Sequence, residues 1–453
     1  MEVTKLETKL GEHLLQHTCV KLSRGEVIVL DTGAVIDAEA TAMLQALHSR
    51  STGGLRSHLK VLEKKGADNF MQSFYVGYGH KSIGDCGTTT VFIESVSMLA
   101  AKAIQDNPLY SGQETSTRYV NFSQQPFIDP TNTNEGGELL EAQRRFYLEA
   151  QEPTRNNLRD IHPKIEKEAE GVYNKAIDAR AFDITRSLLP AGASTNLTWH
   201  TSLRQAADKI VFLRHHPLPE IQEINEGLEM ALKAHHPNSF GHKRYPETEA
   251  FHDIIAENYY YHDLDSPKEP KVNFDKMDRN KLNDTLFQKR PAKTELPKYL
   301  AECGTLEARF QLDFGSFRDI QRHRAINQRM PLLTAELGFN EWYIENLPKE
   351  ITLKLPEHLE YINSEIEKLN ISKEETQYFL PMGYNISDKF VGDLPATVYL
   401  LELRDSRFVH PTLQKVAHNI VQQTINALGI PLHVDSEPNR FDIKRGEHDI
   451  IIK

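Results

Sequence analysis

The tetrapeptide Leu189-Pro190-Ala191-Gly192 returns later in the chain as Leu380-Pro381-Met382-Gly383. Two more short segments recur in the same order around it: Asp85-Cys86-Gly87-Thr88 as Glu302-Cys303-Gly304-Thr305, and Phe212-Leu213-Arg214 as Glu402-Leu403-Arg404. Each match alone has little weight. Three matches in one order indicate an internal duplication, because a repeated sequence encodes a repeated structural unit. We therefore predict two related units, residues 1–235 and 236–453.

The composition is that of a soluble globular protein. Hydrophobic residues make up 39% of the 453 residues and charged residues 26%, which suits two or three domains. No run approaches the roughly 18 apolar residues of a membrane helix, and the N-terminus has no apolar signal core. The three cysteines are far apart and form no CxxC pair, which favours a reducing compartment over disulfides or a thiolate metal site. We expect a cytoplasmic protein without a metal.

The charge balance restricts the ligands that the protein can bind. The formal net charge is -11, so a broad electrostatic surface for nucleic acid is not expected. An anionic small molecule would need a local cluster of arginines. Two segments, described below, contain candidate arginines: one in 111–119 and three in 317–324.

Hydrophobic periodicity gives a coarse secondary structure. It predicts a polar helix at 1–17, a strand at 27–30, and a strand or buried helix start at 88–96. Further helices are expected at 38–47, 54–65, 138–151, 164–181 and 219–234. Residues 263–296 carry the charged stretches SPKEPK and RPAKTE with few large apolar side chains, so we expect an exposed insertion or linker there.

The segment 111–119 reads Ser-Gly-Gln-Glu-Thr-Ser-Thr-Arg-Tyr. A loop of this composition can present backbone N–H groups and hydroxyls to a phosphate, while Arg118 adds a charge-assisted hydrogen bond. Glu114 would repel a phosphate, so we expect it to orient a ring or cap the turn. The alternative is a polar loop that only caps a strand.

The segment 317–324 reads Phe-Arg-Asp-Ile-Gln-Arg-His-Arg and is expected on a helix. Arg318 and Arg322 share a helix face at a spacing of four residues. Arg322 and Arg324 lie roughly 200° apart on an ideal helix, so both can meet one ligand only near a helix end. Cationic side chains in this number suit a pyrophosphate or an electron-rich ring. The alternative is a solvated basic helix face.

Together the two segments resemble the signature of flavin-dependent thymidylate synthases, RHR-x-x-S-x-x-E-x-S-x-R, divided between the two halves. The first half keeps Ser111, Glu114, Ser116 and Arg118, whereas its RHR positions hold Asp106-Asn107-Pro108. The second half keeps Arg322-His323-Arg324, whereas its downstream positions hold Asn327, Met330, Leu332 and Thr334. These losses are complementary, which favours one functional site that draws on both halves.

Further segments extend the resemblance over most of both halves. His80-Lys-Ser82-Ile-Gly-Asp85-Cys86 is similar to the family's H-x-S/T-x-x-E-H segment, of which the second half keeps Glu302. Arg186-Ser-Leu-Leu-Pro190 resembles the family's R-x-x-L-P, whose arginine approaches the nucleotide, and Gln377 stands at its counterpart. Arg214 and Arg404 match the family's late arginine at the end of an L-x-L-R helix.

The resemblance implies an α+β fold of two related units, each with a mixed sheet flanked by helices. It also implies reductive methylation of dUMP to dTMP with FAD, with NADPH and methylenetetrahydrofolate as co-substrates and no protein nucleophile. Family members are homotetramers with active sites at subunit interfaces, so a fused chain would form a homodimer, a pseudo-tetramer. Its partners would be dUMP and folate, with no nucleic acid and no membrane.

Carried over residue by residue, the resemblance implies two sets of binding residues. The substrate-binding set is Ser111, Gln113, Glu114, Ser116, Arg118, Arg186 and Arg214. The cofactor-binding set is Ser82, Asp85, Glu302, Arg322, His323, Arg324 and Arg404. Two other functions stay open. One is a degenerate, non-catalytic paralogue that binds nucleotide or flavin, and the other is a flavoenzyme that modifies a different pyrimidine nucleotide.

Overall fold

The computed structural model describes residues 1–117, 120–435 and 441. The chain forms two compact units that alternate along the sequence. Unit 1 comprises Met1–Thr117 and Ser194–Tyr259, and unit 2 comprises Arg118–Ala193 and Tyr260–Lys453. These units do not follow the boundary at residue 235, because 118–193 lies in unit 2. The repeat boundary concerns sequence similarity and stays a prediction.

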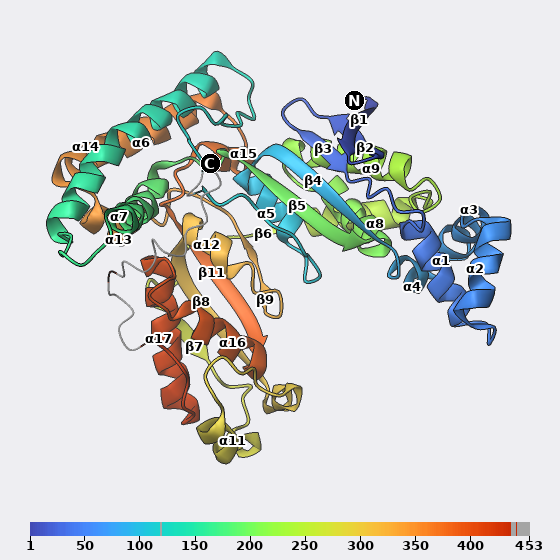
Figure 1. Cartoon of the computed structure of the whole chain (residues 1–453). Coiled ribbons are helices and arrows are strands. Elements are labelled where there is room, and N and C mark those ends of the chain that lie inside the picture. Colours follow the sequence, from blue (N-terminus) through green and yellow to red (C-terminus); the bar gives the residue numbers. More distant parts are fainter. Residues whose placement is uncertain (118–119, 436–440, 442–453) are drawn as a thin grey trace. The chain divides into compact units, whose positions relative to one another are not determined.

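Unit 1 is built on a five-stranded antiparallel sheet in which every strand pairs with the next one along the chain (Figure 1). Its strands are β1 (Val3–Leu10), β2 (His13–Lys21), β3 (Glu26–Val29), β4 (Thr88–Ser97) and β5 (Ser194–Ser202). The predicted strand at 27–30 is confirmed. The predicted helix at 1–17 is wrong, because these residues form the β1–β2 hairpin. Gly11 has a φ of 62° at its turn, which a glycine adopts without strain.

The helices of unit 1 include three that were predicted closely. They are α1 (Ala38–His48), α2 (Gly54–Lys65) and α9 (Pro219–His235), and α9 packs on β2 and β3. The remaining helical segments are α3 (Asp68–Phe70), η1 (Met71–Gly77), α4 (Lys81–Gly84), α5 (Met98–Gln105), α8 (Leu203–Arg214) and α10 (Pro246–Glu257). Trp199 of β5 and Val91 of β4 are fully buried, so the core lies on one face of the sheet.

Unit 2 combines long helices with a four-stranded antiparallel sheet of order β7-β8-β11-β9 (Figure 1). Its strands are β6 (Tyr260–Tyr261), β7 (Lys271–Asn273), β8 (Thr305–Asp313), β9 (Asn327–Gln328), β10 (Met330–Pro331) and β11 (Asn385–Asp393). Its main helices are α6 (Asn134–Ile161), α7 (Glu170–Thr185), α12 (Phe314–Ile320), α13 (Glu341–Asn346), α14 (Lys349–Leu369), α16 (Leu394–Arg404) and α17 (Pro411–Leu428). Shorter segments are η3 (Arg186–Leu188), η4 (Arg279–Lys281), α11 (Asp284–Lys289), η5 (Lys298–Cys303), α15 (Lys373–Thr376) and η6 (Gln377–Phe379).

The fold is α+β with several sheets, as predicted, but the main sheets are not mixed. All their pairings are antiparallel, and among the described strands a parallel pair occurs only between β10 and β6. Antiparallel neighbours need only short turns, such as the one between β1 and β2, whereas parallel neighbours need long crossovers.

The matched sequence segments occupy equivalent positions in two similar strand pairs. β4 and β5 pair antiparallel in unit 1, and β8 and β11 pair antiparallel in unit 2. A helix follows each of the four strands directly, with an N-cap at Ser97, Ser202, Asp313 or Asp393. β4 is one residue longer than β8 because it carries an irregularity near Ser95, whose φ is 57°. This equivalence supports the alignment of the two halves.

The segment 263–296 is not the exposed linker that its composition predicts. It forms β7, η4 and α11, and Phe287 and Leu296 are buried against Leu394 and Val398 of α16. A few large apolar side chains are enough to attach this charged segment to the core. Burial of each such side chain contributes about 1.5–3 kcal/mol to the free energy of folding.

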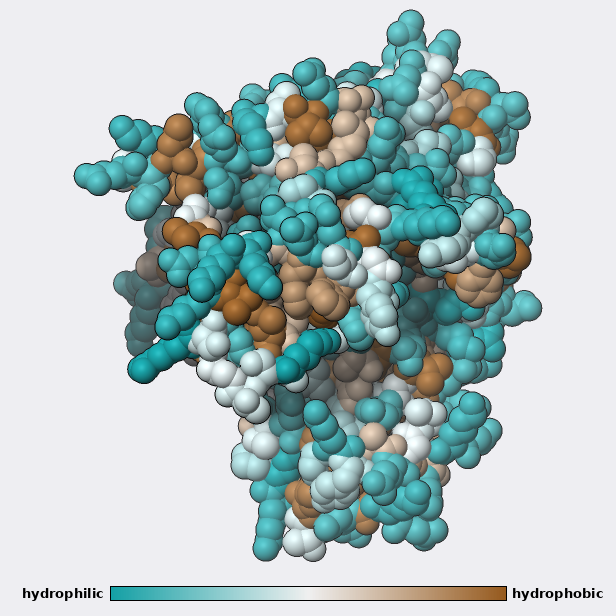
Figure 2. All heavy atoms as spheres, turned by 90° about the vertical axis from the view of Figure 1, so that its right-hand side faces the viewer, coloured by the Kyte–Doolittle hydropathy of each residue, from teal (hydrophilic) through white to brown (hydrophobic). Residues whose placement is uncertain are grey.

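The surface agrees with the hydrophilic composition. The face drawn in Figure 2 is mainly hydrophilic, with separate apolar patches between charged and polar side chains. In the part of the chain that the structure describes, no helix has the length and apolarity needed to span a membrane.

Candidate functional site

Arginines gather around Asp319, which lies in the last turn of α12. Arg322 Nη1 lies 3.9 Å from Asp319 Oδ1, and Arg404 Nη2 donates to the Asp319 carbonyl at 2.7 Å. Burial alone would raise the pKa of Asp319, but four arginines hold it below its usual value: Arg322, Arg404, Arg186 and Arg318. This cluster, which we call the arginine cluster, combines Arg186 of the first half with three arginines of the second half.

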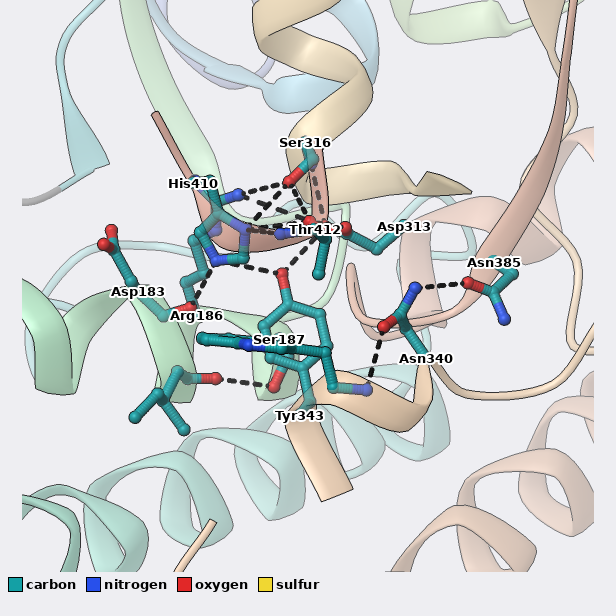
Figure 3. Close-up of polar contacts among 12 residues, drawn as sticks. Asp183, Arg186, Ser187, Asp313, Ser316, Asn340, Tyr343, Asn385, His410 and Thr412 are labelled. Carbon is teal, nitrogen blue, oxygen red and sulfur yellow. Dashed lines mark hydrogen bonds and ion pairs between the residues drawn. The ribbon is translucent and has the colours of Figure 1, made fainter. Parts of the chain in front are cut away.

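Arg186, the arginine of the R-x-x-L-P segment, is buried inside unit 2 and begins η3. Its Nη2 donates to Ser316 Oγ at 2.9 Å and lies 4.0 Å from Asp313 Oδ2 (Figure 3). The guanidinium passes close to Gly315, where a Cβ atom would lie 3.4 Å from Arg186 Nε. Arg186 therefore has polar partners within the protein, and it would have to move to contact a nucleotide.

A buried polar network surrounds Arg186 and Asp313 (Figure 3). The Tyr343 hydroxyl donates to Asp313 Oδ2 at 2.8 Å, and Thr412 Oγ1 donates to Asp313 Oδ1. His410 Nε2 lies 3.0 Å from the Asp183 carbonyl and therefore carries the proton. Burial and the nearby Arg186 lower the pKa of His410 to about 3, so the network contains a neutral imidazole.

The Arg322-His323-Arg324 segment, which we call the RHR turn, lies beyond the helix on which it was expected. α12 ends at Ile320, and the residues after it form a turn. The side chain of Arg322 is 53% exposed and Arg324 is exposed, whereas His323 is buried. His323 Nε2 lies 2.7 Å from Arg404 Nε. Past the helix end, the two exposed arginines are no longer held about 200° apart.

The loop 111–117 runs along β5 in unit 1. The N–H of His200 donates to Ser111 O at 2.7 Å, and the N–H of Thr198 donates to Gln113 O at 2.7 Å. Ser111, Gln113 and Ser116 are exposed. Arg118, the expected phosphate contact, lies outside the described residues.

Glu114 is tied into a buried ion pair. Its carboxylate lies 2.9 Å from Lys102 Nζ and accepts a hydrogen bond of 3.0 Å from Gln105, and both charged side chains are only 1% exposed. The sequence interpretation did not identify Lys102. A signal existed, because Lys102 is the one charged residue in the otherwise apolar run 98–104, which indicates a buried partner.

The remaining predicted ligands are distributed over both units. Asp85 accepts from Arg204 at 2.8 Å in unit 1, where Ser82 is exposed, and Glu302 is exposed in unit 2. Arg214 is paired with Glu229 and, at 2.9 Å, with Glu249. An anionic ligand of Arg214 would have to displace these carboxylates.

Comparisons with known proteins agree with the signature. Residues 34–238 match the family described as thymidylate synthase complementing protein. This segment is a domain of the flavin-dependent thymidylate synthase family. The resemblance read from 111–118 is thereby confirmed at the level of the family. The RHR turn lies outside the matched residues.

Curated relatives match the chain over most of its length. A UPF0159 protein of Chlamydia muridarum is 25% identical over 83% of this chain and 86% of its own length. A UPF0159 protein of Thermoplasma acidophilum is 22% identical over 78% of this chain and 85% of its own length. The UMP/dUMP methylase PolB of Streptomyces cacaoi, solved with 5-Br UMP, matches 50% of this chain and 94% of its own at 15% identity and a TM-score of 0.30. A TM-score this low supports no inference.

The family uses a flavin, and the two halves differ in how well they fit one. The RHR turn presents two exposed guanidinium groups beside a buried imidazole, which suits a diphosphate or an electron-rich ring. The equivalent turn of the first half holds Asp106, whose pKa is raised by burial and whose backbone carbonyl accepts from Lys209 at 2.7 Å. The turn itself, Asp106-Asn107-Pro108, contains no arginine that could bind a flavin phosphate.

Proposed function

We propose that the protein methylates dUMP reductively to dTMP, with FAD, NADPH and methylenetetrahydrofolate. The single observation that carries the proposal is the family domain at 34–238, which includes the loop 111–117. The RHR turn in the second half supports it, because Arg322 and Arg324 are exposed there.

The arginine cluster supports a site that draws on both halves. Arg186 comes from the first half and Arg322 from the second, and both lower the pKa of Asp319. In this proposal the loop 111–118 holds the nucleotide phosphate through Arg118. Arg322 and Arg324 hold the flavin.

The chain's own residues bind, orient and neutralise charge. When bound, the flavin supplies the hydride that the uracil ring receives. Arginines beside the ring stabilise the negative charge that develops there, and preorganised cations are most effective in a site that excludes water. Fused chains that pair as a homodimer would complete the site, and light scattering of the purified protein measures that oligomeric state.

A second candidate is a non-catalytic paralogue that binds nucleotide or flavin. The internal pairing of Arg214 with Glu229 and Glu249, and of Glu114 with Lys102, favours it. Arg186 is likewise engaged with Ser316. Side chains that already have partners inside the protein bind an external ligand only by giving up those partners.

Absorbance and turnover of the purified protein separate the two candidates. The enzyme is expected to bind FAD, with flavin absorbance, and to oxidise NADPH only when dUMP and methylenetetrahydrofolate are added. UMP in place of dUMP tests for a different pyrimidine substrate. A colourless protein that does not bind added FAD, and a gene that does not complement a thymidine-requiring strain, would reject the proposal.

A further inference from the structure

Arg404 holds the RHR turn from the side of α16. Its Nε donates to His323 Nε2 at 2.7 Å, and its Nη2 donates to the Asp319 carbonyl at 2.7 Å. The second bond occupies a carbonyl in the last turn of α12, which has no partner within the helix. One guanidinium therefore fixes both the helix end and the histidine of the turn.

The direction of the first bond determines the tautomer of His323. An arginine only donates, so His323 Nε2 must accept and the ring proton must be on Nδ1. Charged or titratable groups around the ring are Arg404, Asp319 and Tyr399, whose ring lies 6.0 Å from the imidazole. Burial and Arg404 lower the pKa of His323 to about 3, while Asp319 opposes this shift. His323 is thus a neutral acceptor.

Gln328 holds the turn from the side of β9. Its Nε2 donates to the Ile320 carbonyl at 2.9 Å and lies 3.3 Å from the His323 carbonyl. The backbone of the turn is therefore fixed from two sides. The side chains of Arg322 and Arg324 remain exposed.

The equivalent arginine of the first half has other contacts. Arg214 ends α8 as Arg404 ends α16, but its guanidinium pairs with Glu229 and Glu249. The equivalent turn there is held instead by Lys209, which donates to the Asp106 carbonyl. An arginine therefore holds the turn in the half that keeps the RHR sequence, and a lysine holds the equivalent turn in the other half.

We propose that Arg404 is a positioning residue that orients the Arg322–Arg324 turn for the flavin and is not itself a flavin ligand. The orientation of the turn for the flavin, which is the second part of this inference, rests on the proposed function. The first part, the control of the His323 ring, can be measured without any ligand.

The first experiment reads the histidine rings of the flavin-free full chain by ¹⁵N NMR, with His323→Gln to assign the signal. We expect an unprotonated, accepting Nε2 in the wild type. Arg404→Met should release this nitrogen and raise the pKa of His323, while Arg404→Lys should restore the accepting state, because an ammonium also donates. Arg214→Met is the matched control and should leave the His323 signal unchanged. An Arg404→Met variant with an unchanged His323 signal would overturn the inference.

The second experiment titrates FAD into the same variants. Arg404→Met should weaken FAD binding roughly 10-fold to 100-fold, because a displaced turn loses a charged hydrogen bond from Arg322 or Arg324 to the flavin, with Arg404→Lys intermediate. Arg322→Ala should weaken it without changing the His323 signal. An Arg404→Met variant that alters the His323 signal but binds FAD normally would reject the positioning role. Wild-type protein that binds no FAD would instead reject the proposed function, and the NMR result would still stand.

Discussion

Pro190 and Pro381 face each other in an antiparallel backbone bridge within unit 2. The hydrogen bonds on either side are reciprocal. The N–H of Ala191 donates to Leu380 O at 3.0 Å, and the N–H of Met382 donates to Leu189 O at 2.8 Å. The two copies of the repeated tetrapeptide are therefore related by a local two-fold axis.

The same relation continues one residue further. The N–H of Gly192 donates to Tyr378 O at 2.9 Å, and the N–H of Gly383 donates to Ser187 O at 2.9 Å. Contacts in which residue i meets j and j meets i are typical of isologous dimer interfaces. Two equivalent segments of one chain thus meet in the manner of two subunits, as expected for a fused pair.

The buried pair of Glu114 and Lys102 makes the first prediction. Glu114→Gln removes the carboxylate and leaves Lys102 charged and buried, which should lower the free energy of unfolding by about 3–5 kcal/mol. Denaturant unfolding measures this loss. Gln113→Ala, at the exposed neighbouring position, should change it by no more than about 0.5 kcal/mol. A Glu114→Gln variant of normal stability with weakened dUMP binding would show a ligand role instead.

The buried carboxyl group of Asp388 should make the stability of the protein depend on pH. It is fully buried in β11, and burial raises its pKa from 3.8 to about 7, although the backbone N–H of Lys389 opposes this shift. Between these values the native state binds more protons than the unfolded state, so this group lowers stability as the pH rises. The stability of Asp388→Asn relative to the wild type should therefore increase by roughly 4 kcal/mol from pH 4 to pH 8. Equal pH dependence in both proteins would contradict the raised pKa.

Mutations in the segment 263–296 test whether it packs against the core. Phe287 is 1% exposed and packs against α16, whereas Leu264 is 57% exposed. Phe287→Ala should lower the free energy of unfolding by about 3–5 kcal/mol, because it leaves a cavity. Leu264→Ala should have little effect, within about 0.5 kcal/mol. Similar small effects at both positions would show that the segment is the exposed linker first expected.

The two halves should differ in flavin binding. The RHR turn offers two exposed arginines, but the turn at Asp106 carries a carboxylate held near Lys209. Asp106 and Pro108, the counterparts of Arg322 and Arg324, supply no guanidinium group to a flavin phosphate, so we expect one FAD per chain. Absorbance at saturation, set against the protein concentration, measures the ratio. Two FAD per chain would mean that the first half also binds.

Sequence patterns predicted the local structure best where periodicity was strong. The helix 54–65 agrees with α2, and the repeated segments fall at equivalent places beside two similar strand pairs, although the strand pairs themselves were not predicted. The N-terminal hairpin was missed because its lysines and leucines also fit a helical spacing. The apolar run around Lys102 indicated a buried partner for it, but not that this partner is Glu114. The burial of Phe287 depends on contacts that no local pattern encodes. The diversion of Arg186 and Arg214 to internal partners was missed for the same reason.

The central claim is that the nucleotide loop of the first half and the RHR turn of the second half serve one site. Steady-state oxidation of NADPH in response to dUMP, measured together with flavin content in Arg118→Ala and Arg322→Ala, tests it most directly. Arg118→Ala should raise the KM for dUMP roughly 10-fold to 100-fold with normal flavin content, and Arg322→Ala should lower the flavin content with little change in that KM. Wild-type kinetics and flavin content in both variants would contradict the claim.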